Sequence, residues 1–143
     1  MTNDFEFVKL KDSNWFERQK IAGKITARCL NLARDMINNH NNLSLKEIEK
    51  ACLDVMIKND CTPTFLNYKG FPGAICTSVN QQLVHGIPSD YKIQEGDVVK
   101  IDLGATYKDA IGDSAITVIK GQAKHKDHIE LVKVTEECLN KGI

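Results

Sequence analysis

Residues 98–119 read VVKIDLGATYKDAIGDSAITVI. β-Branched and other apolar residues dominate two runs, Val98–Ala105 and Ala110–Ile119, and the polar residues between them are typical of a hairpin turn. Each run carries one aspartate in its interior, Asp102 in the first and Asp113 in the second. The centre of the fold is therefore predicted to be an antiparallel pair of strands with an acidic residue on each.

The two aspartates are separated by an odd number of residues. In a hairpin with an even-length loop, this spacing places both side chains on the same face of the sheet. One register sets Asp102 and Asp113 directly opposite each other, and the adjacent register makes them diagonal neighbours; both allow a shared ion. A divalent cation would neutralise the paired charges. The alternative is that both lie on a solvated strand face, or pair with Lys or Arg.

The segments before this hairpin predict two helices and two further strands. Apolar residues recur at three- and four-residue steps over residues 13–39, which indicates an amphipathic helix. A capping-box pattern at Ser44 and Glu47 begins a second helix that extends to about Lys58. The short β-like runs are Thr64–Tyr68 and Ala74–Val79.

A charged linker, residues 120–127, follows the hairpin and precedes a last helix that begins near Asp127. Ile129, Val132 and Cys138 or Leu139 are predicted to face inward from this helix. Helices, then an antiparallel sheet, then one more helix define an α+β fold, with the helices packed on one face of the sheet.

The composition excludes several functional classes. The 19 basic residues balance the 19 acidic residues, which gives no electrostatic footprint for nucleic acid or an anionic membrane. No apolar run approaches a membrane span, and the N-terminal residues lack the apolar core of a signal peptide. The five cysteines are scattered, which favours reduced thiols in a cytoplasmic protein.

Further sequence blocks resemble a known family. They are Gly70-Phe71-Pro72-Gly73-Ala74-Ile75-Cys76-Thr77-Ser78-Val79-Asn80, Val84-His85-Gly86-Ile87-Pro88, Glu95-Gly96-Asp97 leading into Asp102, and Gly112-Asp113-Ser114. Their order and spacing closely resemble the type I, bacterial-like methionine aminopeptidases. Ala22-Gly23 and the turn at Asn67-Tyr68-Lys69-Gly70 also fit, so the resemblance covers nearly the whole chain.

The resemblance implies a cytoplasmic metalloexopeptidase, a hydrolase with the pita-bread fold that removes N-terminal methionine from new proteins. Asp102 would chelate one of two divalent metal ions, and Asp113 would bridge both; the metal could be Co, Mn, Fe or Zn. His85 would be catalytic and hydrogen-bond the substrate's scissile amide. Phe65, Tyr68 and Phe71 would line the pocket for the methionine side chain. The alternatives are a locally bonded turn histidine and ordinary core packing of the aromatic residues.

The family completes its site with one His and two Glu ligands from a second half-domain. We expect residues 1–143 to form a single domain equivalent to the N-terminal half, without the C-terminal half, and to be nearly inactive alone. The expected partner is a complementary C-terminal half or a second copy, covering an apolar sheet face. The alternative function is a non-catalytic interaction module that kept the half-fold. A proline-specific peptidase of the same superfamily is disfavoured by the His85-Gly86-Ile87-Pro88 turn.

Overall fold

The computed structural model describes residues 10–143, so the expectation about a signal peptide, which depends on residues 1–9, lies outside the described residues. The elements are α1 (Ser13–Asn39), α2 (Leu45–Lys58), β1 (Thr62–Pro63), the 3-10 turn η1 (Tyr68–Gly70), β2 (Cys76–Val79), β3 (Val98–Tyr107), β4 (Ala110–Ile119) and α3 (Lys126–Gly142). Within these residues, no helix is long and apolar enough to cross a membrane. All three predicted helices and the central hairpin are confirmed.

Side-chain caps explain where the first two helices begin. The carboxylate of Asp12 accepts a hydrogen bond from the Trp15 N–H at 2.7 Å, which satisfies a free donor in the first turn of α1. The predicted capping box of α2 is present, because the Ser44 hydroxyl accepts from the Glu47 N–H while the Glu47 carboxylate accepts from the Ser44 N–H.

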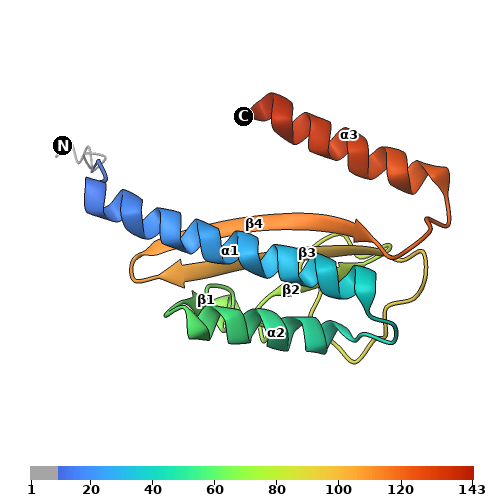
Figure 1. The fold of residues 1–143 in the computed structure, drawn as a ribbon, viewed down its shortest axis with the longest axis horizontal. Helices are drawn as coiled ribbons and strands as arrows, with labels where there is room; N and C mark the ends of the chain where they lie inside the picture. The colour runs from blue at the N-terminus through green and yellow to red at the C-terminus, as the bar shows by residue number, and fades with distance from the viewer. Residues whose placement is uncertain (1–9) are drawn as a thin grey trace, which may run out of the picture.

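Strand β3 is the centre of the sheet. It pairs with β4 over its whole length, from Val98 opposite Ile119 to Tyr107 opposite Ala110. The other edge of β3 is shared by β2 and β1, which pair with its first and second halves. All pairs are antiparallel, and Figure 1 shows β4 lying at the edge of the sheet.

Alternate residues of β3 build the hydrophobic core. Val99, Ile101, Leu103 and Ala105 are fully buried and pack against apolar residues of α1 and α2. Helix α1 lies so close to β4 that a Cβ placed on Gly112 would be 2.7 Å from the backbone of Ala22. The expected α+β fold, with helices on one face of an antiparallel sheet, is confirmed for α1 and α2.

The predicted strand Thr64–Tyr68 is wrong. The segment turns instead, with the Asn67 N–H donating to the Phe71 carbonyl at 2.8 Å. Asn67 and Lys69 both adopt positive φ angles, 65° and 48°, which no strand accommodates. Turn chemistry at Asn67 and Gly70 overrides the β propensity of the aromatic residues.

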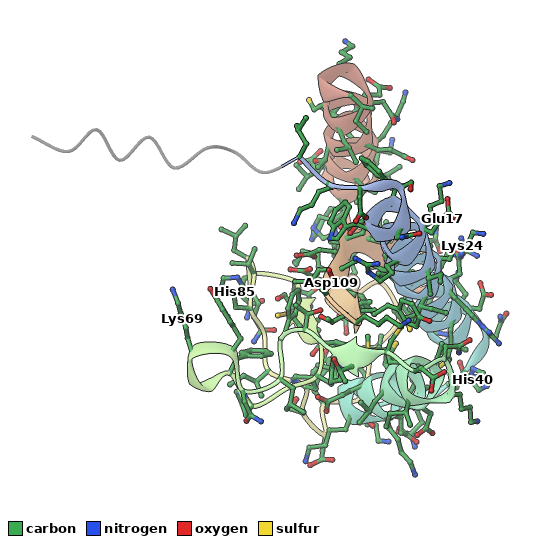
Figure 2. The ribbon with its side chains drawn as sticks, turned by 90° about the vertical axis from the view of Figure 1, so that its left-hand side faces the viewer. Glu17, Lys24, His40, Lys69, His85 and Asp109 are labelled. Carbon is green, nitrogen blue, oxygen red and sulfur yellow. The ribbon has the colours of Figure 1, made fainter. Side chains whose placement is uncertain are left out.

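Helix α3 forms as predicted, but its apolar side does not face inward. None of its residues is buried, and the side chains of Ile129 and Leu139 are 57% and 63% exposed. Cys138 is also exposed. Figures 1 and 2 both place α3 beyond β4, apart from the layer that α2 forms. Exposed apolar side chains lie on α3 and also on β4, where Ile111 is 47% accessible, and the expected uncovered sheet face stays a prediction.

Candidate metal and substrate site

The hairpin register places Asp102 and Asp113 on the sheet face opposite the core. Asp102 is paired with Ala115, and Asp113 with Gly104, so the two aspartates are diagonal neighbours. Since Leu103 and Ile101 face the core, Asp102 must point to the other side. Diagonal neighbours in a ladder lie roughly 7–8 Å apart, a span that two carboxylates can bridge through bound cations. The diagonal register, one of the two anticipated geometries, is the one observed.

The electrostatics of this face are unfavourable in the absence of a cation. Burial raises the pKa of Asp102, and the negative charge of Asp113 raises it further. His85 acts in the opposite direction and lowers the pKa of Asp102. The next residue, Gly86, donates its N–H to the Ser78 hydroxyl, and Ser78 lies on the same sheet face as Asp102. Two neighbouring acidic groups, one of them half-buried, favour binding of a positive ion.

His85 lies on the loop that follows β2 and precedes β3. Figure 2 shows it extending from the same side of the molecule as Lys69. Its φ angle of 56° is left-handed, and the next residue, Gly86, lies so close to β2 that a Cβ there would be 2.1 Å from the Thr77 carbonyl oxygen. The backbone around His85 is therefore held in a strained conformation by its contact with β2.

The three aromatic residues occupy different positions. The half-buried Phe65 lies on the carboxylate face, since its ring is 3.2 Å from the position of a Cβ on Gly104, the register partner of Asp113. Phe71 packs over Gly73, whose Cβ position is 3.1 Å from the ring. Tyr68 is 64% exposed. Phe65 thus lies beside the carboxylates, whereas Tyr68 stands out from the turn with its side chain largely in solvent.

Two residues on this face were missed at the sequence level. Cys76 is the register partner of Asp102, and burial together with the charges of Asp102 and Asp113 raises the pKa of its thiol to about 11. Lys100 precedes Asp102 by two residues and shares its face. The alternation of side chains along β3 would have been enough to place Lys100 on this face. Placing Cys76 there required the register between β2 and β3.

Two acidic side chains of the described chain, Asp102 and Asp113, lie on this face. Within residues 10–143, no group of three or more His, Cys, Asp and Glu side chains is arranged to hold a metal ion. His125 and His128, which stack edge to face at 5.2 Å, lie at the start of α3, and Figure 1 shows that helix beyond β4.

The antiparallel sheet with α1 and α2 on one face matches one half of the pita-bread fold. The profile of metallopeptidase family M24 matches residues 17–143, and the chain belongs to this family. The methionine aminopeptidase of Mycoplasma capricolum subsp. capricolum is 40% identical over 136 residues, which cover 95% of this chain and 53% of that protein. Methionine aminopeptidase 1 of Bacillus subtilis is 39% identical, over 85% of this chain and 48% of that protein.

Solved structures agree with these sequence matches. The structure is similar to methionine aminopeptidase from Thermotoga maritima, with a TM-score of 0.88 and 37% identity over 94% of this chain and 53% of that one. Prolidase from Pyrococcus furiosus has a TM-score of 0.75 at 22% identity over 90% of this chain and 36% of that one, which shows a shared fold. The chain spans about half the length of the curated relatives it matches.

Proposed function

We propose that residues 1–143 form the N-terminal half of the catalytic domain of a metal-dependent aminopeptidase that removes N-terminal methionine from newly made proteins. The observation that carries the proposal is the placement of Asp102 and Asp113 on one face of the sheet, against which the loop of His85 is bonded through Gly86 and Ser78. The similarity to methionine aminopeptidases supports the substrate.

The residues present fit a pair of divalent cations. Asp102 and Asp113 are both carboxylates and share one sheet face. Burial and the charge of Asp113 destabilise the ionised form of Asp102. Asp102 and Asp113 would be the two residues of this chain that hold the ions. When bound, such ions supply an activated water at neutral pH and polarise the scissile carbonyl.

The remaining side chains would bind and orient the peptide. His85 would hydrogen-bond the amide nitrogen at the scissile bond and support the departing amine. Phe65, Tyr68 and Phe71 would form an apolar wall for an unbranched side chain such as methionine. Tyr68 is 64% exposed in this half, so we expect it to become covered when the substrate or the rest of the site is in place.

We further propose that a complementary C-terminal half covers α3 and the edge of β4. Helix α3 exposes Leu131 and Leu139, 65% and 63% accessible, and β4 is an edge strand of ten residues. Exposed apolar surface and an open strand edge are features that native proteins normally cover. Self-association through the same surfaces is the competing arrangement. Free cysteines, four of them buried, support the proposed cytoplasmic location.

The test joins this chain to the remaining C-terminal segment of the Mycoplasma capricolum relative and measures methionine release from a Met-Gly peptide with Co²⁺ or Mn²⁺. We expect metal-dependent release by the fusion, at least a hundredfold loss in D102N and D113N, and little activity from residues 1–143 alone. A fusion that folds, binds metal and releases no methionine would support a non-catalytic interaction module instead.

A further inference from the structure

His85 lies on a loop whose beginning and end are both next to strand β2. It begins at Asn80, directly after β2, and it ends at Gly86, which folds back onto β2. Asn80 and His85 both have left-handed backbones, with φ angles of 52° and 56°. Because such conformations cost about 1 kcal/mol or more for residues other than glycine, the surrounding contacts must stabilise them.

Each end of the loop is held by one member of a single cross-strand pair. Ser78 of β2 and Lys100 of β3 are register partners on the carboxylate face. The Lys100 ammonium donates a 2.8 Å hydrogen bond to the carbonyl oxygen of Asn80 at the beginning of the loop. The Ser78 hydroxyl accepts a 3.0 Å hydrogen bond from the Gly86 N–H at its end.

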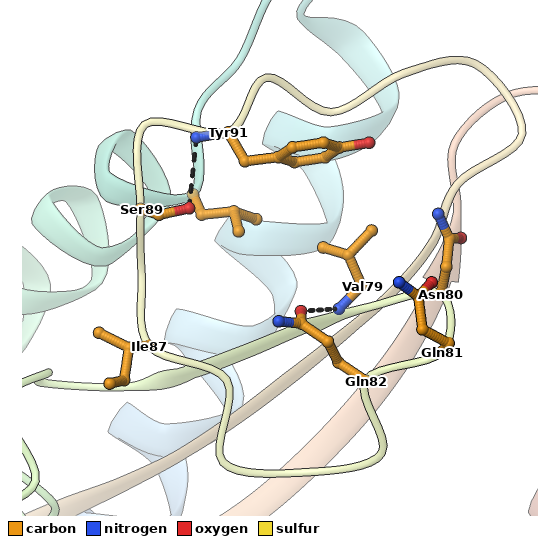
Figure 3. A pocket seen from close by; sticks show the side chains of 8 residues that line it. Val79, Asn80, Gln81, Gln82, Ile87, Ser89 and Tyr91 are labelled. Atoms are coloured by element: carbon orange, nitrogen blue, oxygen red, sulfur yellow. Dashed lines mark hydrogen bonds between the residues drawn. The ribbon is translucent and has the colours of Figure 1, made fainter.

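Secondary contacts make the base of the loop stiff. The Asn80 N–H donates to the Val98 carbonyl at 2.9 Å, and the Val98 N–H donates to the Asn80 side chain at 3.0 Å. The Gln82 side chain accepts from the Val79 N–H at 2.9 Å, a bond drawn in Figure 3. Between this base and Gly86, the residues that lead to His85 are exposed, and Leu83 is 81% accessible.

We propose that the Ser78–Lys100 pair is a clamp that positions His85 over the carboxylate face. The inference builds on the catalytic role proposed for His85, and it makes Ser78 and Lys100 positioning residues for that role. Lys100 lies two positions before Asp102 on the same strand face, so the clamp fixes the imidazole relative to the carboxylates through one rigid element.

The test measures backbone N–H order parameters of the 143-residue chain by NMR relaxation, a readout that requires no activity. We expect the order parameter of His85 to be about 0.85 in the wild type and to fall below about 0.6 in K100M, which keeps the apolar stem but removes the donor. S78A should lower it to the same range. K100R, which keeps a charged donor, should give the wild-type order parameter at His85. K24M, a matched change at an exposed lysine of α1, should leave that order parameter unchanged.

The core strand provides the second reference. Ile101 and Leu103 should keep their order parameters in every variant, because they face the helices and not the loop. The proposal is overturned if His85 remains ordered in both K100M and S78A, or if Ile101 and Leu103 lose order together with it. Should one variant fail to fold, the other decides by the same criterion.

The proposed function is tested separately in the active fusion. There, K100M should lower kcat about tenfold or more and leave KM within about twofold, since the clamp orients His85 and does not bind the methionine side chain. An inactive wild-type fusion would contradict the enzyme assignment, while the order parameters would still decide whether the clamp exists.

Discussion

Helices α1 and α3 have the same kind of amphipathic sequence but different surroundings. Helix α1 buries seven residues against the sheet and α2, including Ala22, Cys29 and Ile37, whereas α3 buries none. Periodicity therefore specifies that a helix forms and which side is apolar, but the partner of that side depends on the rest of the fold. The contrast shows that α1 contributes to the core, whereas the apolar side of α3 is exposed within the described residues.

The largest expected contrast lies between a leucine of the core and a leucine of α3. L103A removes a fully buried side chain and should lower the free energy of unfolding by about 2–5 kcal/mol. L131A, at a position that is 65% exposed, should change it by less than about 0.5 kcal/mol. Urea denaturation measures both, and comparable losses would show that α3 is packed against the chain in solution.

Asp97 connects the core to the linker of α3 and should give the next largest effect. Its side chain is 1% exposed and accepts hydrogen bonds from Asn80, Tyr91, Gln94 and Lys124 at 2.7–3.0 Å. Burial raises the pKa of this carboxylate, but these donors outweigh burial and bring it to about 2. D97N should therefore cost about 2–3 kcal/mol at pH 7.

The pH dependence follows from that lowered pKa. The stabilisation by Asp97 is fully present above its ordinary pKa of 3.8 and is lost as the pH falls through about 2. The difference between wild type and D97N should thus be largest near pH 7 and nearly vanish near pH 2, as measured by urea melts at both values. An equal difference at both pH values would assign the effect to packing instead of charge.

The close contact between α1 and β4 predicts opposite effects at two neighbouring glycines. G112A would drive a Cβ against the backbone of Ala22 and should cost about 1–3 kcal/mol. G23A, on the facing helix, meets no atom within 4 Å and should stabilise the chain by about 0.5–1 kcal/mol through higher helix propensity. Thermal melts that show the same sign for both would contradict the described contact.

The smallest expected effect concerns the repulsion between the carboxylates. Because burial and Asp113 raise the pKa of Asp102, its ionisation weakens the folded state above that pKa, and D102N should stabilise the metal-free chain by about 0.5 kcal/mol at pH 7. The gain should fade as the pH falls through the raised pKa and be absent below the ordinary pKa of 3.8. D109N should shift stability in the opposite direction, since Arg18 lowers the pKa of Asp109.

Local sequence patterns predicted most of the fold and the two candidate ligands. Caps and periodicity placed α1 and α2, and the odd spacing of Asp102 and Asp113 placed them on one face. The choice between the direct and diagonal registers needed the turn geometry, in which Lys108 and Asp109 form the two-residue loop and Lys108 has a φ angle of 56°. The pairing of β2 with β3, which places Cys76 and Ser78 on the carboxylate face, is a long-range contact that no local pattern encodes.

The central claim is that Asp102 and Asp113 form one shared cation site on the face opposite the helices. Titration of the metal-free chain with Mn²⁺, followed by loss of the free-ion EPR signal, tests it most directly. We predict weak binding, with a Kd on the order of 10⁻⁴–10⁻³ M, which weakens at least tenfold in D102N and in D113N and is unchanged in D109N. Binding that survives in both D102N and D113N, or that is lost equally in D109N, would contradict the claim.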